Sequence, residues 1–95
     1  MVDYNEPELR KKLLRVYNRF VENPTDKTNL EEIKRLDNEY ESLGAVNDYL
    51  ASQPISKEMG NAIGYLSNLW LNEFNLSRKE IKSEAKKILE ELRKS

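Results

Sequence analysis

The sequence has no cysteine and no histidine among its 95 residues. Without cysteine the chain can form no disulfide bond, no thiolate metal site and no thiol nucleophile. Without histidine it lacks the side chain that most often acts as a general base or metal ligand near neutral pH. A Ser-His-Asp triad, a Cys-His pair and the Glu-x-x-His motif of di-iron bundles are therefore excluded. We expect a protein that is not an enzyme and that binds no cofactor and no metal.

The sequence also lacks an excess of charge of one sign and lacks long hydrophobic runs. Sixteen basic residues oppose 17 acidic ones, so the net charge is −1 although 35% of the residues are charged. A nucleic-acid binder would carry a basic surplus, so we expect no nucleic acid as a partner. No stretch approaches the roughly 18 apolar residues that a membrane span needs, and the first residues lack the features of a secretory signal. We therefore expect a cytoplasmic protein.

Glycine and proline are scarce, with three of each, and the hydrophobic residues between them recur at helical spacing. The spacing predicts helices over about 6–22, 28–43, 57–75 and 78–94. Residues 45–52 form either a short extra helix or a bent extension of the second helix. Short connections favour antiparallel neighbours. We predict an all-α fold, an antiparallel four-helix bundle that makes one domain of residues 1–95.

Local motifs mark where these helices begin and end. Thr28 with Glu31, and Ser77 with Glu80, form two capping boxes. Ser56 is a further expected N-cap residue of the third helix. Gly44, in turn, occupies the position of a glycine just past a helix end. These motifs predict helix boundaries and carry no information on function.

One face of each predicted helix is apolar and should form the core. The third helix, over 57–75, contains the only tryptophan and is the hydrophobic axis of the chain. Its core positions are Met59, Ile63, Leu66, Trp70 and Phe74. The other helices contribute Leu9, Leu13, Val16, Tyr17 and Phe20; Leu30, Ile33, Leu36, Tyr40 and Leu43; and Ile81, Ala85, Ile88, Leu89 and Leu92.

A second stripe of the third helix carries Gly60, Gly64, Ser67 and Leu71. Each glycine inside a helix costs about 1 kcal/mol relative to alanine, so two of them on one face require a reason. Either the backbone of another helix crosses closely there, or the stripe is a shallow groove for a partner.

Candidate binding residues lie in the second half of the chain. Four cations share a stripe beside the apolar face of the last helix: Lys79, Lys82, Lys86 and Arg93. They form either a solvated face or a contact with an anionic partner or membrane surface. Tyr65, at the edge of the third helix beside Leu69, is a candidate aromatic contact.

The order of several segments along the chain resembles that of a known protein family. They are LLRVYN at 13–18, a break at NP 23–24, FNLS at 74–77 before a lysine-rich helix, and ILEEL at 88–92. This layout resembles the immunity proteins that protect lactic acid bacteria and their relatives from pediocin-like (enterocin A type) bacteriocins. The likeness lies in the order of these segments over most of the chain. The length of the chain and its lack of cysteine also agree with it.

The resemblance implies a non-enzymatic protein that acts from the cytoplasm. Such a protein recognises the bacteriocin-bound sugar-transport receptor at the inner membrane face, where it can touch anionic lipid, and blocks the pore. Recognition would belong to the second half of the chain, and we expect a monomer. The expected contact residues are Tyr65, Leu69, Lys79, Lys82, Lys86 and Arg93.

A second class of function is open from the same residues. The chain can be a small helical adaptor or regulatory protein, encoded by a phage or plasmid, that binds another protein or itself. The groove of Gly60 and Gly64, or a ridge of Leu14 and Val21, would then be its interface.

Overall fold

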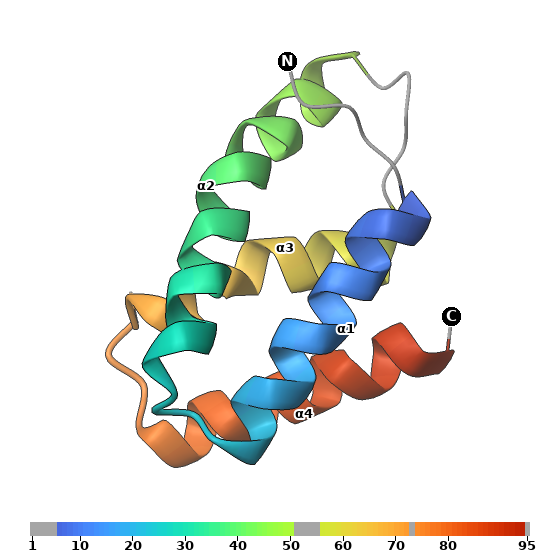
Figure 1. Ribbon diagram of the computed structural model, residues 1–95. Helices are drawn as coiled ribbons and strands as arrows, with labels where there is room; N and C mark the ends of the chain where they lie inside the picture. Colours follow the sequence, from blue (N-terminus) through green and yellow to red (C-terminus); the bar gives the residue numbers. More distant parts are fainter. Residues whose placement is uncertain (1–5, 51–55, 73, 95) are drawn as a thin grey trace.

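Four α-helices build the computed structural model, and they fold as an all-α four-helix bundle, as predicted. The helices are α1 (Glu6–Glu22), α2 (Lys27–Leu50), α3 (Lys57–Trp70) and α4 (Arg78–Lys94) (Figure 1). The structure describes residues 6–50, 56–72 and 74–94, with only the backbone of 41–50. Within these ranges no helix combines the length and the apolar character that crossing a membrane requires.

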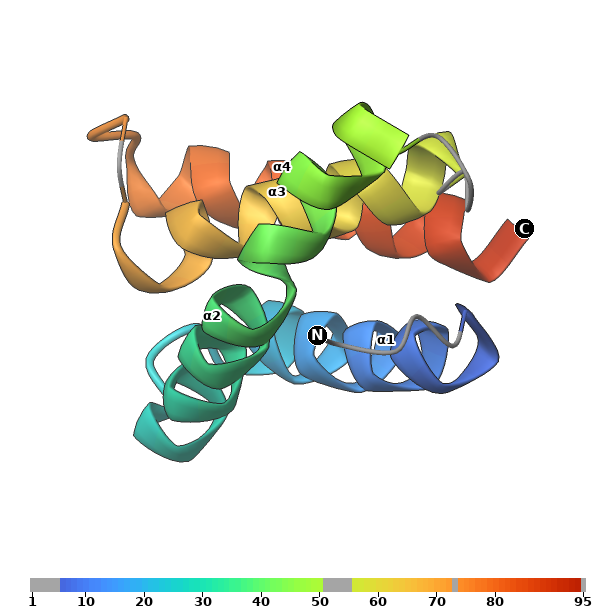
Figure 2. The same ribbon diagram turned by 90° about the horizontal axis from the view of Figure 1, so that it is seen from above.

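The helices pack in pairs that do not follow their order along the chain. Helix α1 packs mainly on α4, and α2 mainly on α3, while α3 and α4 also lie side by side. Figure 2 shows α3 and α4 in one layer and α1 in the other. Helices α1 and α2 diverge from their connecting turn (Figure 1). Among the described residues one ion pair joins these two helices, between Arg15 and Glu32.

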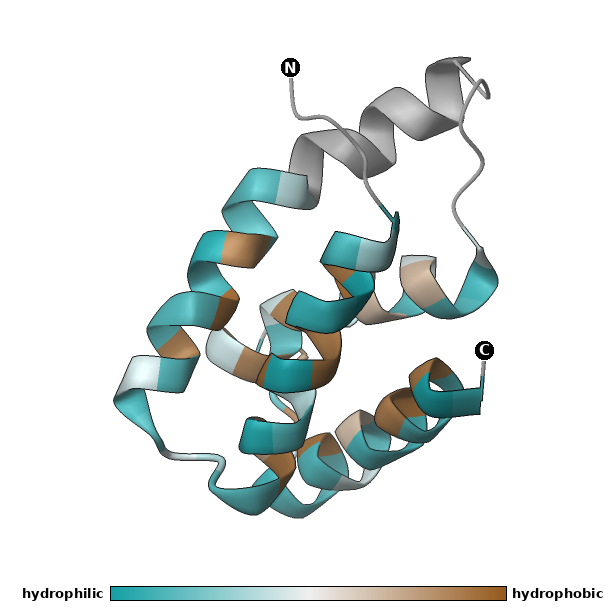
Figure 3. Cartoon of the chain, turned by 45° about the vertical axis from the view of Figure 1, so that its right-hand side comes forward, coloured by the Kyte–Doolittle hydropathy of each residue, from teal (hydrophilic) through white to brown (hydrophobic). Residues whose placement is uncertain are grey.

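One hydrophobic core joins all four helices. The predicted core faces of α1 and α4 are buried throughout, and hydrophobic positions recur along one side of each helix (Figure 3). Burying a side chain of this kind stabilises a fold by about 1.5–3 kcal/mol. The buried core residues of α1 and α4 are Leu9, Leu13, Val16, Tyr17, Phe20, Ile81, Ala85, Ile88, Leu89 and Leu92.

Helix α2 differs from its prediction at both ends. It runs through Gly44 to Leu50, so the extension of the second helix is correct and the stop at 43 is wrong. A glycine ends a helix only where the chain also turns into the left-handed region. At the start, the Asp26 carboxylate accepts the Thr28 amide at 3.1 Å. Asp26 therefore caps α2, and the predicted Thr28 capping box is wrong.

Helix α3 ends earlier than predicted, at Trp70 instead of about 75. Asn72 has a φ of 53°, and its side chain accepts the Leu76 amide and donates to the Leu76 carbonyl, both at 2.9 Å. This arrangement holds the loop away from helical geometry. Phe74 therefore leaves the core stripe, and its side chain is 70% exposed. Its assignment to the core is wrong because its position relative to Trp70 depended on an unbroken helix.

The two serine caps behave differently. Ser77 accepts the Glu80 amide at 3.2 Å, which confirms the serine half of that capping box. Ser56 occupies the N-cap position of α3, yet its side chain forms no capping bond. Its hydroxyl oxygen is buried without a hydrogen-bond partner among the described residues.

Candidate binding site

The cationic stripe of α4 is exposed along its length. Lys79, Lys82 and Lys86 are all exposed, and none forms an ion pair with a described residue. Arg93 is also exposed and donates to the Asn18 side-chain oxygen at 3.0 Å, which ties it to α1. Glu90, four residues after Lys86, shares this side of the helix and lowers its positive charge. The stripe is therefore a surface of three lysines with a mixed-charge end.

Tyr65 and Leu69 do not form the exposed contact that was expected. Leu69 is only 7% exposed and belongs to the core. Tyr65 is half-buried, and its hydroxyl oxygen is buried without a partner among the described residues. Burial raises the pKa of Tyr65, and the carboxylates of Glu84 and Glu80 on α4 add to the rise. Leu69 therefore lies in the core and Tyr65 packs against it, so neither is the exposed residue that was expected.

The glycine stripe of α3 is open. Gly60 and Gly64 are exposed, and a Cβ atom added at either would meet no described atom within 4 Å. A close crossing of this face is not found among the described residues. Of the two interpretations, an open face agrees with the structure.

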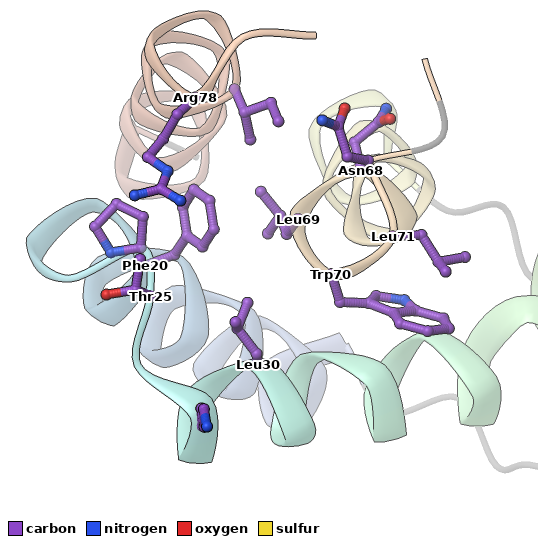
Figure 4. Close-up of a pocket in the computed structure, with 12 residues that line it drawn as sticks. Phe20, Thr25, Leu30, Asn68, Leu69, Trp70, Leu71 and Arg78 are labelled. Carbon is purple, nitrogen blue, oxygen red and sulfur yellow. The ribbon is translucent and has the colours of Figure 1, made fainter. Parts of the chain in front are cut away.

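A hollow among the described residues lies beside the connection between α1 and α2 and the connection between α3 and α4, and we call it the loop-end cleft (Figure 4). It has a volume of about 500 Å³. All four helices contribute to it: the end of α1, the start of α2, the end of α3 and the start of α4. Its lining residues include Phe20, Lys27, Leu30, Asn68, Leu69, Leu71, Arg78 and Ile81.

The floor of the loop-end cleft is apolar. Figure 4 shows Leu69 pointing into the space between Phe20 and Leu30. Phe20, Leu69 and Ile81 are 4%, 7% and 7% exposed, and Leu30 is half-buried against the same core. The cleft therefore opens directly onto the hydrophobic core.

The described charged groups that border this floor are all positive. Lys27 and Arg78 are exposed, and neither forms an ion pair with a described residue. No carboxylate belongs to the described lining. Asn68 also lines the cleft; it is 2% exposed, and its side-chain oxygen has no hydrogen-bond partner among the described residues. The cleft thus combines two cations with one buried, unused acceptor.

Trp70 fixes one side of the loop-end cleft to α2. Its indole nitrogen donates to an Asp37 carboxylate oxygen at 2.8 Å. The Lys34 ammonium lies 5.3 Å from the centre of a Trp70 ring, within the range of a cation–π interaction. Next to this anchored ring, Leu71 is 54% exposed and points away from Leu69 (Figure 4).

The described lining of the loop-end cleft offers apolar surface, cations and amide groups, which are groups that recognise a ligand. The described residues also include no group of three or more acidic side chains placed to hold a metal ion. Sequence reasoning missed the cleft because its residues come from four separate segments. Arg78, a cation at the first residue of a predicted helix, was a local sign.

Comparisons with protein-family models, with curated proteins and with solved structures found no match for this chain.

Proposed function

We propose that this chain is a non-enzymatic immunity protein that acts from the cytoplasm against a pediocin-like bacteriocin. The observation that carries the proposal is the bundle itself: four helices, with α3 and α4 side by side and a cationic surface on α4. A four-helix chain with a lysine-rich last helix agrees with the resemblance, which implies recognition in the second half of the chain. The protein would bind the bacteriocin-bound receptor at the inner membrane face and keep its pore closed.

The surface available for that contact is narrower than the sequence indicated. Lys79, Lys82 and Lys86 are exposed and can meet an anionic surface of the receptor or the lipid beside it. Tyr65 and Leu69 hold α3 against the rest of the bundle and would act only by positioning α4. We therefore assign direct contact to the three lysines, with Arg93 at the end of the same stripe.

Expression in a strain sensitive to pediocin-like peptides tests this function. We expect the inhibitory concentration of at least one peptide in a panel to rise several-fold. The double variant Lys82→Glu with Lys86→Glu should lose this protection while keeping its helical circular dichroism spectrum. The matched control, Lys11→Glu with Arg19→Glu, makes the same charge change at exposed positions of α1 and should still protect. Protection against no peptide, at a verified level of protein, would overturn the proposal.

A second candidate function is that of a small adaptor or regulatory protein, encoded by a phage or plasmid. The exposure of Leu71 and Phe74, at 54% and 70%, favours it, because large apolar side chains gathered at a surface often mark a protein contact. The open face of Gly60 and Gly64 is available to the same partner. If the protein binds a purified partner protein but protects no strain against any bacteriocin, the adaptor function is favoured.

A further inference from the structure

We propose that the loop-end cleft binds a segment of a partner protein in which a bulky apolar side chain stands next to a carboxylate. The proposal goes beyond bacteriocin immunity and does not rest on it. It follows from three independent properties of the cleft: its apolar floor, its unpaired buried acceptor and its two cations.

The floor selects an apolar side chain. A space of about 500 Å³ lies in the range of ligand sites, and Phe20, Leu69 and Ile81 form its base from three different helices. An apolar side chain placed there would displace water from the edge of the core. Leu71, 54% exposed at the edge, extends this apolar surface outward.

The acceptor selects a polypeptide backbone. Buried polar groups nearly always have a hydrogen-bond partner, and an unpaired one is costly. The side-chain oxygen of Asn68 is buried and has none among the described residues. This oxygen has almost no accessible surface, so a backbone N–H donor of an inserted segment would supply the missing bond after the Asn68 amide turns toward the cleft. A lipid surface, which offers acyl chains at this depth, would not supply it.

The cations select a carboxylate. Lys27 is the first residue of α2 and Arg78 the first residue of α4, so both stand at the partial positive end of a helix. A cation is unfavourable for the helix at this position, whereas an anion bound beside either residue gains from its charge and from the helix end. The guanidinium of Arg78 can also hold a carboxylate through two parallel hydrogen bonds. In Figure 4 Arg78 lies beside Phe20, so charge and apolar floor adjoin.

The edge of the cleft is held in place before any partner arrives. Asn72 closes the loop after α3 through two hydrogen bonds to Leu76, each 2.9 Å long. Trp70 is anchored to Asp37 on α2. Little conformational freedom is then lost on binding, which favours affinity.

Nuclear magnetic resonance titration of the whole chain tests the proposal. The probes are two capped peptides, acetyl-Gly-Glu-Phe-Glu-Gly-amide and the same peptide with glutamine in place of both glutamates. We expect the acidic peptide to shift the signals of Asn68, Trp70 and Arg78, and to bind about tenfold more tightly than the neutral one. Raising the salt concentration should reduce this preference.

Two variants decide whether the cleft is responsible. Arg78→Gln should bring the affinities of the two peptides to within about twofold of each other, since the charge-assisted bonds are lost. Lys11→Gln removes one exposed cation from α1, outside the cleft lining, and should leave the tenfold preference intact. Circular dichroism of both variants checks that the bundle is folded.

Three outcomes would overturn the proposal. They are equal binding of both peptides, no shift at the cleft up to about 1 mM peptide, and shifts caused only by vesicles of anionic phospholipid. The last would assign this end of the bundle to a membrane surface. None of these outcomes bears on protection against bacteriocins, which the stripe variants test separately in cells.

Discussion

Tyr17 joins α1 to α3 in the centre of the core. Its side chain is fully buried, and its hydroxyl donates to the Ala62 carbonyl oxygen at 2.7 Å. Burial raises the pKa of Tyr17 well above its usual value of 10.0. Negative charge on Tyr65, Asp37 and Glu84 adds to this rise. The side chain is thereby held in the neutral form that can donate its hydrogen bond.

We predict that the free energy of unfolding falls as the pH rises above about 10. The folded-state pKa of Tyr17 lies above its unfolded-state value, so the unfolded chain loses this proton first. The stability linked to the neutral tyrosine is therefore complete below pH 10 and is lost at higher pH. The variant Tyr17→Phe should lose about 1 kcal/mol of stability at neutral pH because the hydrogen bond is missing. Its free energy of unfolding should fall less above pH 10 than that of the parent protein. Urea denaturation across the pH range measures both effects.

Tyr40→Phe is the comparison for this prediction. The pKa of Tyr40 is raised less, first by burial and then by the Glu39 carboxylate. Removing the Tyr40 hydroxyl should therefore alter the fall of the unfolding free energy at high pH less than removing the Tyr17 hydroxyl. If the unfolding free energy of Tyr17→Phe falls above pH 10 as much as that of the parent protein, the Tyr17 hydroxyl is not the group that causes the fall.

At the scale of elements, the ends of the helices depend on side chains beyond the apolar pattern. Asp26 starts α2 through the Thr28 amide, and Asn72, with a φ of 53°, keeps α3 from continuing past Trp70 and Leu71. The loop after α3 therefore carries Leu71 into an exposed position beside the loop-end cleft. A change of one turn in the length of α3 thus decides which apolar residues reach solvent.

We predict that Gly60→Ala and Gly64→Ala each stabilise the protein by up to about 1 kcal/mol. Alanine is the stronger helix former and loses less conformational freedom on folding. Both sites are exposed and have space for a Cβ atom among the described residues. Thermal and urea denaturation of the single and double variants would show the gain. A loss of stability in either variant would mean that another surface packs on this face.

At the scale of the whole molecule, the bundle is compact. Its radius of gyration over Cα atoms is 12.8 Å, close to the value of about 12 Å expected for a domain of this length. The two connections 23–26 and 71–77 lie at the same end of the bundle (Figure 1). Residues of both connections line the loop-end cleft. Its existence depends on how all four helices are placed.

We predict that the protein is a monomer in solution. Among the described residues, only Leu71 and Phe74 are large hydrophobics with high exposure, and two side chains fall short of the roughly 1,000 Å² that a stable interface buries. Sedimentation equilibrium should therefore give the mass of one chain, 11.2 kDa. A dimer that dissociates on the change Phe74→Ser would contradict this and assign the loop to self-association.

The sequence alone was enough to predict the class of fold and the buried faces of α1 and α4. Helical periodicity is a local property, so positions such as Leu13 and Ile88 could be assigned to the core without knowing their partners. The Ser77 cap could be predicted for the same reason, because it involves neighbours in the chain. The cationic stripe of Lys79, Lys82 and Lys86 followed from spacing too, and the structure leaves all three exposed.

Only the tertiary structure decided which helices pair and where their ends meet. Lys27 and Arg78 line the same cleft although they lie far apart in the sequence, and no local pattern predicts this. The burial of Leu69 and the exposure of Phe74 likewise depended on where α3 ends and what packs on it. Hydrophobic burial sets each helix face, but a site made from four helices arises only when their relative placement is known.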